Sequence, residues 1–261
     1  MAFFDPKLVE ILNSAAAAAG AEILRIRDQG HDVREKHDSS PVTDADEAGE
    51  RIILEMLEAA TPDIPIVAEE KAAAGCMPDD VGSRFWLVDP LDGTKEFIRG
   101  LADFTVNIAL VDEGVPAMGV VYAPARGDLY FVCAPDKACV RTLGADGKWS
   151  ADRPIHVREP RPEGLAIVAS KSHRNQETDD FIAKLPVKTL VSAGSSLKFC
   201  LVATGDADVY PRLGPTMEWD TAAGDAVLRA AGGTVTTLEG ELFHYGKLDF
   251  RNGYFVAKGA C

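Results

Sequence analysis

The segment from Trp86 to Thr94 constrains the fold and chemistry of this chain more than any other. An apolar run that starts at Trp86 ends in Asp89-Pro-Leu-Asp92-Gly-Thr94, so two carboxylates lie three residues apart where a buried strand would end. The proline between them restricts the backbone, and a tight turn there can direct both acids toward one point. Gly93 and Thr94 then offer backbone N–H groups where a helix is expected to begin, which favours phosphate binding.

Two further acidic features accompany this segment. Glu69-Glu70 follows the short apolar run 64–68, and Trp219-Asp220 opens a helical pattern far downstream. Carboxylates without nearby histidine or cysteine suit hard cations, above all Mg²⁺. A metal beside a phosphate site indicates metal-assisted hydrolysis of a phosphate ester. Two aspartates at this spacing, taken alone, are also typical of a turn whose acids cap a helix, which is the commoner meaning.

Composition excludes several classes of protein. The chain has 261 residues, of which 46% are apolar, which is enough for a sizeable core in one large domain or two small ones. The formal net charge of −14 argues against a broad surface that binds a nucleic-acid polymer. The five cysteines are odd in number and lack CxxC spacing. We therefore expect neither a disulfide scaffold nor a zinc site. We also expect the protein to lie in a reducing compartment.

The sequence also bears on location. No stretch approaches the roughly 20 apolar residues of an integral membrane segment. The alanine run 15–19 is weakly apolar, and no basic leader precedes it, since the first charged residue is Asp5. These features predict a cytoplasmic protein. Peripheral contact with the cytoplasmic face of the inner membrane stays open, and the sequence does not indicate an oligomeric state or an oligomeric partner.

Periodicity predicts an α+β or α/β chain with two unlike parts. Helical spacing covers Pro6 to Gln29 and Thr43 to Ala60, with Thr43 as N-cap. Strands and hairpins are predicted near 65–68, 84–88, 104–110, 117–122, 129–133 and 138–142. Beyond the charged, proline-rich segment 153–162, strands at 165–169, 188–191 and 208–210 alternate with helices at 175–184, 195–204 and 219–231. We expect one compact unit over 1–261, with a metal-binding half over about 1–160 and a substrate-recognition half over about 161–261.

Four short motifs follow one another along the chain. They are Val42-Thr-Asp-Ala-Asp46, Glu69-Glu70, Asp89-Pro-Leu-Asp-Gly-Thr94 and Trp219-Asp-Thr-Ala-Ala223. Together they resemble the inositol monophosphatase-like family of Mg²⁺-dependent, Li⁺-sensitive phosphatases, over most of the chain. The resemblance implies a layered αβαβα sandwich, which is compatible with the predicted element order.

The resemblance also implies roles for individual residues. One Mg²⁺ would be held by Glu69, Asp89 and the Leu91 carbonyl, and a second by Asp89, Asp92 and Asp220. A third, looser ion near Glu69 is possible. Thr94 and Asp46 would orient and deprotonate the attacking water, so that Asp46, Thr94 and Glu69 form the implied catalytic set.

Further segments resemble one subgroup of the family, the bacterial 3′(2′),5′-bisphosphate nucleotidases. These are Lys95-Glu-Phe97 after Thr94, and the segments 170–173, 194–200 and 210–216. Arg212 lies near a position where inositol-specific members carry an acid, and a guanidinium suits a second phosphate better than a neutral polyol. Lys71 departs from the serine that the family often has after its paired glutamates.

The predicted substrate-binding set combines the helix start with the cations. Ser195 would open a helix and Lys198 would lie one turn along it, so both could hold phosphate. Lys198 and Arg212 could equally be ordinary surface charges. The predicted set is Gly93, Thr94, His173, Ser195, Lys198, Arg212 and Asp220.

The resemblance thus implies a phosphatase with a small phosphorylated nucleotide as substrate and two, possibly three, Mg²⁺ ions. It would remove the 3′-phosphate of adenosine 3′,5′-bisphosphate to give AMP, which recycles a by-product of sulfate assimilation. Two alternatives stay open. One is an inositol monophosphatase or fructose-1,6-bisphosphatase activity, and the other is a non-catalytic regulator that binds metal or nucleotide.

Overall fold

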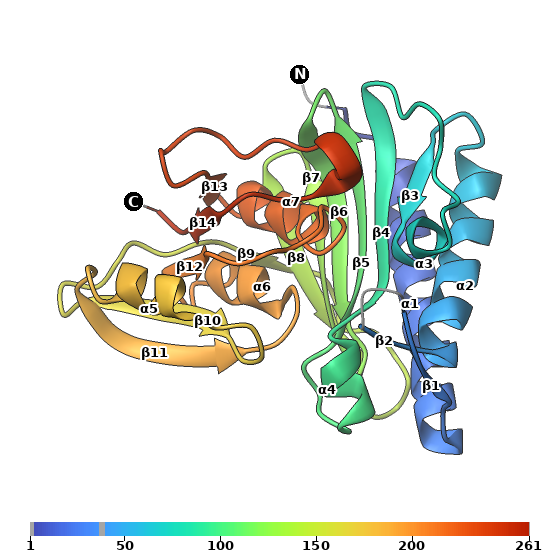
Figure 1. Ribbon diagram of the computed structural model, residues 1–261, viewed down its shortest axis with the longest axis horizontal. Coiled ribbons are helices and arrows are strands. Elements are labelled where there is room, and N and C mark those ends of the chain that lie inside the picture. The colour runs from blue at the N-terminus through green and yellow to red at the C-terminus, as the bar shows by residue number, and fades with distance from the viewer. Residues whose placement is uncertain (1–2, 37–39, 261) are drawn as a thin grey trace.

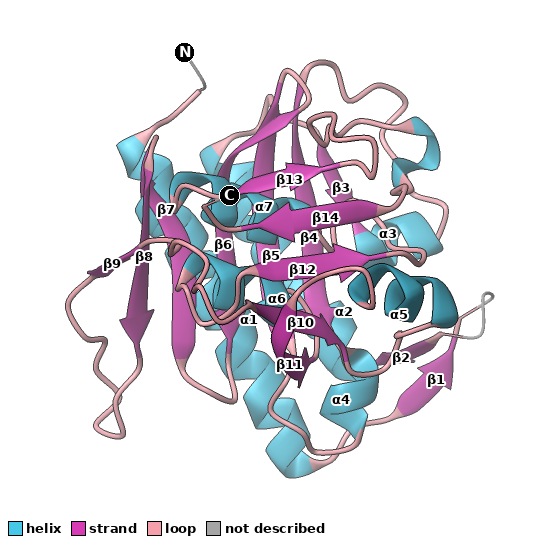
Figure 2. Cartoon of the chain, turned by 90° about the vertical axis from the view of Figure 1, so that its left-hand side faces the viewer, coloured by secondary structure: helices cyan, strands magenta, loops and turns pink. Residues whose placement is uncertain are grey.

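The computed structural model describes residues 3–36 and 40–260, which form five layers of alternating helices and sheets (Figures 1 and 2). Helices α1 (Pro6–Gln29) and α2 (Asp44–Ala60) cover one face of a seven-stranded sheet. Helices α6 (Leu197–Ala203) and α7 (Ala222–Ala230) lie between that sheet and a five-stranded one, and α5 (Gln176–Ile182) covers the outer face. The predicted αβαβα sandwich is therefore confirmed.

The large sheet has the strand order β3-β4-β5-β6-β7-β8-β9, and the small one β11-β10-β12-β14-β13. The large sheet comprises β3 (Ile66–Ala68), β4 (Arg84–Asp92), β5 (Thr105–Asp112), β6 (Val115–Ala123), β7 (Asp128–Ala134), β8 (Lys137–Thr142) and β9 (Arg153–Ile155). The small sheet comprises β10 (Leu165–Ser170), β11 (Val187–Ala193), β12 (Val209–Arg212), β13 (Thr234–Thr236) and β14 (Phe255–Lys258). A hairpin of β1 (Val33–Glu35) and β2 (Pro41–Thr43), the short helices α3 (Glu69–Ala73) and α4 (Thr94–Ile98), and a 3₁₀ turn at Leu248–Phe250 complete the set.

The two long N-terminal helices begin where their capping residues predict. The Asp5 side chain accepts a hydrogen bond from the Lys7 amide, and Pro6 occupies the first turn of α1. At α2, Thr43 and Asp46 form a capping box, in which each side chain accepts from the other end of the first turn. These helices bury their apolar stripes against the sheet, with Leu12, Ala19 and Ile23 at most 3% exposed.

Strand β4 separates two hydrophobic cores. Trp86 and Val88 point into the core beneath α1 and α2, whereas Phe85 and Leu87 point into the core that α6 and α7 fill. This alternation follows from the period of two along a strand. Because both faces are covered, β4 is apolar from Phe85 to Val88, and the strand carries Asp89 into the interior, where it is 1% exposed.

Several predicted boundaries are wrong. Helix α6 starts at Leu197 with Ser196 as its N-cap, so Ser195 precedes the helix and has a left-handed φ of 47°. Helix α7 starts at Ala222, two residues after Asp220. The segment 153–162, which lies at the predicted boundary between the halves, begins with β9, and β9 pairs with β8.

The cysteine prediction also needs correction. The structure joins Cys133 and Cys139 in a disulfide across β7 and β8, because neighbouring antiparallel strands bring residues six apart together. Cys76 and Cys200 are free, and Cys261 lies outside the described residues. A single local disulfide is still no disulfide scaffold. In the described ranges, no helix has both the length and the apolar character needed to cross a membrane.

Gly119 on β6 permits the close approach of α7 to the large sheet. A Cβ atom there would lie 2.8 Å from the Ala226 Cβ and 3.0 Å from the Ala223 carbonyl oxygen. We expect Gly119→Ala to lower the free energy of unfolding by about 1–3 kcal/mol, as overpacking does. Gly253→Ala, which meets nothing within 4 Å, is the control and should change it by less than about 0.5 kcal/mol. Urea denaturation measures both, and equal effects would contradict this packing.

Candidate active site

The end of β4 is irregular where the two aspartates stand. Asp89 pairs with Asn107 and Asp92 with Thr105, with a shift of register between the two pairs. Pro90 has no N–H to give to the ladder, which suits a bulge. The Leu91 amide donates instead to Asp89 Oδ1 at 3.0 Å. The predicted tight turn is therefore a bulged strand end, and the bulge re-aims two side chains that a regular strand would direct to opposite faces.

Gly93 connects the strand to α4 in the left-handed region, with a φ of 95°. A Cβ there would lie 2.9 Å from the Asp103 carbonyl oxygen, so both conformation and space favour glycine. Thr94 then opens α4 as expected. Its hydroxyl lies 3.1 Å from Asp46 Oδ1 and 3.2 Å from the Leu91 carbonyl oxygen. One hydroxyl proton serves only one of these acceptors at a time.

Asp46 is the buried partner of that hydroxyl. Its other oxygen accepts from the Thr43 amide at 2.8 Å and from the Thr43 hydroxyl at 2.6 Å. Burial raises the pKa of Asp46 to about 6, and the bonds from Thr43 oppose that rise. The structure thus brings Asp46 and Thr94 together although 48 residues separate them.

Four carboxylates accumulate around the end of β4. Burial raises the pKa values of Asp89 and Asp220 well above the usual range, and neighbouring acids raise them further. Glu69 acts on both, so the carboxylates from three separate segments lie close enough to repel one another. Asp92 also has a raised pKa because of burial, which Lys198 partly offsets. All four predicted carboxylate ligands therefore share one region.

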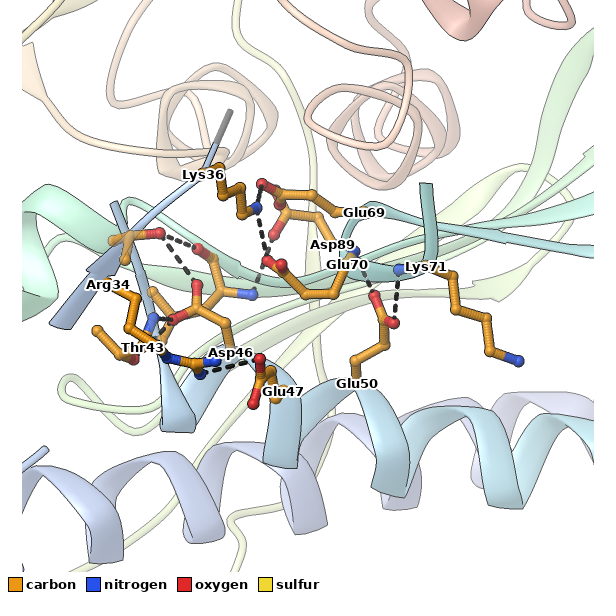
Figure 3. Close-up of polar contacts among 12 residues, drawn as sticks. Arg34, Lys36, Thr43, Asp46, Glu47, Glu50, Glu69, Glu70, Lys71 and Asp89 are labelled. Atoms are coloured by element: carbon orange, nitrogen blue, oxygen red, sulfur yellow. Dashed lines mark hydrogen bonds and ion pairs between the residues drawn. The ribbon is translucent and has the colours of Figure 1, made fainter. Parts of the chain in front are cut away.

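The cation nearest to Glu69 is Lys36 (Figure 3). Its Nζ lies 2.8 Å from Glu69 Oε1 and 2.7 Å from Glu70 Oε1. Burial lowers the pKa of Lys36, but the two glutamates outweigh burial and raise it, while burial and Glu69 raise the pKa of Glu70 to about 7. In this arrangement the ammonium group occupies the space between two carboxylates.

The donor chemistry of this region fits a divalent cation. The donors are buried carboxylate oxygens, the type of ligand that Mg²⁺ prefers. The positive charge buried beside them is smaller than their combined negative charge. Within the described residues, no three acidic, histidine or cysteine side chains already stand as ligands around one point.

A cavity of about 500 Å³ opens beside these carboxylates. The acidic part of its lining, called the acidic wall below, includes Glu69, Asp92 and Asp220. The basic part, called the cationic wall, includes His173, Lys198 and Arg212, and the predicted residues Gly93, Thr94 and Ser195 also line the cavity. Asp46, Asp89 and Leu91 are buried and are not among the lining residues. Acidic and basic side chains thus line one cavity.

The cations of the second wall are buried, which overturns the alternative that they are ordinary surface charges. Lys198 is 5% exposed and Arg212 is 7% exposed. Burial lowers the pKa of Lys198 to about 8, and its ammonium contacts the Ser195 carbonyl. Arg212 Nη2 donates to the Pro215 carbonyl at 2.8 Å. Among the described residues, neither Arg212 Nε nor the buried Ser195 hydroxyl has a hydrogen-bond partner.

His173 belongs to the rim of the cavity. Desolvation and the nearby charges of Arg212 and Lys95 lower its pKa, so the neutral form is favoured. Its amide donates to the Ser170 hydroxyl at 3.1 Å. The predicted site residue is therefore in place, but it contributes less positive charge than a free histidine would.

The sequence prediction missed three polar residues of the site. The Ser196 hydroxyl lies 3.2 Å from Asp92 Oδ2 and 2.8 Å from the Asp220 carbonyl oxygen, and its one proton serves one of them at a time. Glu96 is 3% exposed, lines the cavity and accepts from the Ser172 hydroxyl. Lys36 forms the bridge described above. Glu96 and Ser196 carried a signal, since they lie in the segments 95–97 and 194–200 that resemble the nucleotidases.

Known proteins resemble this chain in sequence and in fold. The sequence model of the inositol monophosphatase family matches residues 6–259. The chain belongs to that family. This result confirms the resemblance inferred from the four motifs, and the match spans both halves of the chain.

Individual relatives point to one subgroup. The 3′(2′),5′-bisphosphate nucleotidase CysQ of Escherichia coli K12 is 45% identical over 88% of this chain and 90% of its own length. The protein of that name from Salmonella typhimurium is 43% identical over 91% and 94%. The crystal structure of CysQ from Bacteroides thetaiotaomicron has a TM-score of 0.80 and 37% identity, and the match covers 98% of each chain.

The crowding of these carboxylates predicts how the stability of the metal-free protein depends on pH. Because the pKa of Asp220 is raised, the native state binds more protons than the unfolded state above about pH 4, and stability falls as pH rises. We expect Asp220→Asn to raise the melting temperature of metal-free protein at pH 8 by about 2–4 °C, which is roughly 1 kcal/mol in a domain of this size. The change should also flatten the decline between pH 5 and 8.

Calorimetry in chelator at several pH values checks this expectation. Asp136→Asn, in the exposed turn between β7 and β8, is the control and should follow wild type. A lower melting temperature for Asp220→Asn at pH 8 would show that its hydrogen bond from the Met217 amide, 2.8 Å long, outweighs the repulsion.

Proposed function

We propose that this chain is a Mg²⁺-dependent phosphomonoester hydrolase that converts adenosine 3′,5′-bisphosphate to AMP and phosphate. One observation carries the proposal: two buried cations, Lys198 and Arg212, line the same cavity as three carboxylates, those of Glu69, Asp92 and Asp220. A substrate with two phosphates matches both walls, since one phosphate meets the cations while the other approaches the acids. The relatives named bisphosphate nucleotidases support the same assignment.

The acidic wall would hold the ions. Glu69, Asp89 and the Leu91 carbonyl would bind one Mg²⁺, Asp89, Asp92 and Asp220 a second, and Glu69 a loose third. Bound Mg²⁺ would polarise the phosphate and offset charge that develops on the attacking and leaving oxygens. The chain itself holds these donors in place through the β4 bulge and the bond from Ser196 to Asp92.

Asp46 and Thr94 would handle the proton of the attacking water. With a pKa of about 6, Asp46 is mostly ionised at neutral pH and accepts a proton through the Thr94 hydroxyl, 3.1 Å away. The water oxygen forms a bond to phosphorus as the bond to the 3′-oxygen breaks. The departing 3′-oxygen takes up a proton and leaves as the ribose hydroxyl of AMP.

The cationic wall would select the nucleotide. Lys198 and Arg212 would bind the phosphate that is not cleaved, with the Ser195 hydroxyl as a further donor and His173 at the rim. Arg212 Nε is a buried donor without a described partner, and a phosphate oxygen would satisfy it. A phosphate beside Lys198 would also keep its ammonium charged, against the burial that lowers its pKa to about 8.

The first test concerns reaction and substrate. With Mg²⁺, we expect phosphate release from adenosine 3′,5′-bisphosphate to exceed release from inositol 1-phosphate, fructose 1,6-bisphosphate and AMP, and chelator should abolish it. Asp89→Asn should lower kcat by about 10³-fold or more with the fold retained, since two ions lose a shared ligand. Phosphate release from the purified protein and circular dichroism of the variant measure these effects.

Other outcomes would redirect the proposal. Preference for a sugar phosphate would leave a phosphatase with another substrate. Binding of nucleotide and metal without turnover would favour the non-catalytic regulator. Near-normal turnover by Asp89→Asn at saturating Mg²⁺ would contradict the shared ligand.

The second test concerns the phosphate that is not cleaved. A charge-assisted hydrogen bond contributes about 1.5–3 kcal/mol, so Arg212→Ala should lower kcat/KM for the bisphosphate about 10- to 150-fold. Hydrolysis of 3′-AMP, which lacks the second phosphate, should change far less. Lys198→Ala should act similarly, and the double variant should be less than additive if both cations bind one phosphate. Equal losses on both substrates would remove Arg212 and Lys198 from this role.

A further inference from the structure

Helix α3, which begins with the proposed ligand Glu69, lacks a cap of its own. Its N-cap residue is Ala68, whose side chain accepts no hydrogen bond. The carboxylate of Glu50, twenty residues earlier on α2, takes that place. Its Oε2 accepts from the Glu70 amide at 2.7 Å and its Oε1 from the Lys71 amide at 3.0 Å (Figure 3). One side chain thus binds two consecutive amides of the turn that carries Glu69.

Both carboxylate oxygens of Glu50 are used in this contact. It is 5% exposed, and none of the ion pairs among the described residues includes it. Burial raises its pKa, and the bonds from the two amides oppose that rise. A buried carboxylate without a cation is costly unless amides satisfy it. The buried position of Glu50 therefore indicates that its carboxylate serves to hold these two amides in place.

The same helix carries the proposed water-activating acid. Asp46 and Glu50 are four residues apart on α2, so they lie on one face of the helix, one turn from each other. Asp46 is held by the capping box, and the rest of α2 packs against α1 and β4. Helix α2 thus forms a rigid spacer with Asp46 at one turn and the start of α3 attached at the next.

We propose that Glu50 is a positioning residue that holds the α3 start so that Glu69 stands at the ion site in a fixed relation to Asp46. The inference rests on the proposed function, because Glu69 has this importance only as an ion ligand. Without Glu50, the Glu69 backbone would be tied mainly through β3, and the Lys36 bridge would compete more effectively for its side chain. Ion affinity would then suffer first, and the chemistry at full ion occupancy would suffer little.

Glu50→Gln tests this with almost no change in shape. The amide keeps one acceptor oxygen, so one of the two bonds is lost. We expect the half-saturating Mg²⁺ concentration to rise about 10- to 100-fold, as for other residues that orient metal ligands. At saturating Mg²⁺, kcat and the KM for the bisphosphate should return to within about threefold of wild type. Glu55→Gln, an exposed change on the same helix, is the matched control.

Two further readouts separate this inference from the proposed function. Hydrogen exchange of metal-free protein should show faster exchange at the Glu70 and Lys71 amides in Glu50→Gln, and not in Glu55→Gln. Calorimetric titration with Mg²⁺ alone should show the same loss of affinity without any substrate. A wild-type protein that hydrolyses no phosphate ester would defeat the proposed function, while these two measurements would still decide the role of Glu50.

Two results would overturn the inference. One is a Mg²⁺ affinity and an exchange pattern identical to those of Glu55→Gln. The other is a loss of turnover that is equal at every Mg²⁺ concentration and accompanies a lower melting temperature, which would make Glu50 a purely structural cap. Glu50→Asp supplies a graded check, since its shorter side chain keeps the charge and should give a smaller rise in half-saturating Mg²⁺ than Glu50→Ala.

Discussion

Repulsion among buried carboxylates dominates the centre of this molecule. Glu69, Asp89, Asp92 and Asp220 come from three segments, and burial together with mutual repulsion raises the pKa values of the three aspartates. Such a cluster opposes folding unless cations offset it. The protein places Lys36 on one side and Lys198 on the other, but their charges do not match the whole cluster. The remaining deficit of positive charge would favour a bound cation, and without one it lowers the stability of the fold.

The fold tolerates this cluster because the surrounding layers are rigid. Strand β4 is buried on both faces and ends in a bulge, so the two aspartates are aimed by the backbone and not by flexible loops. Asp46 is tied to the same point from α2 through Thr94. Asp220 enters from the far side, where its carbonyl accepts from Ser196 at the start of α6. Asp46, Asp89 and Asp92 are thus fixed to elements that pack against the hydrophobic core, and their relaxation away from one another is limited.

The sequence predicted what depends on local chemistry. Pro6 and Thr43 mark the starts of α1 and α2 correctly, because a fixed φ and a side-chain cap act within one turn. Three of the four motifs also supplied residues that line one cavity, and the fourth supplied Asp46, which contacts Thr94 there. The prediction failed where distant contacts decide. Ser195 takes a left-handed conformation that only its tertiary setting explains, and β13 and β14 are too short to show a period before they pair. Glu50 had no signal at all, since its partners are backbone amides twenty residues away.

The proposed roles divide unequally between the two parts of the chain, and this bears on how specificity can vary within the family. Apart from Asp220, the acids belong to the first part, on β4 and at the starts of α2 and α3. Lys198 and Arg212 belong to the second, on α6 and at the end of β12. Replacing Lys198 and Arg212 would change the side chains that bind the end of the substrate away from the cleaved phosphate. The β4 bulge and its acids would stay in place. A shared fold can therefore keep one hydrolytic centre while it accepts sugar or nucleotide phosphates. Asp220 and Ser196 are the exception, because Ser196 at the start of α6 lies within hydrogen-bond distance of Asp92 in the first part and of the Asp220 carbonyl. We therefore expect substitutions that change substrate specificity to be tolerated better at Arg212 than at the start of α6.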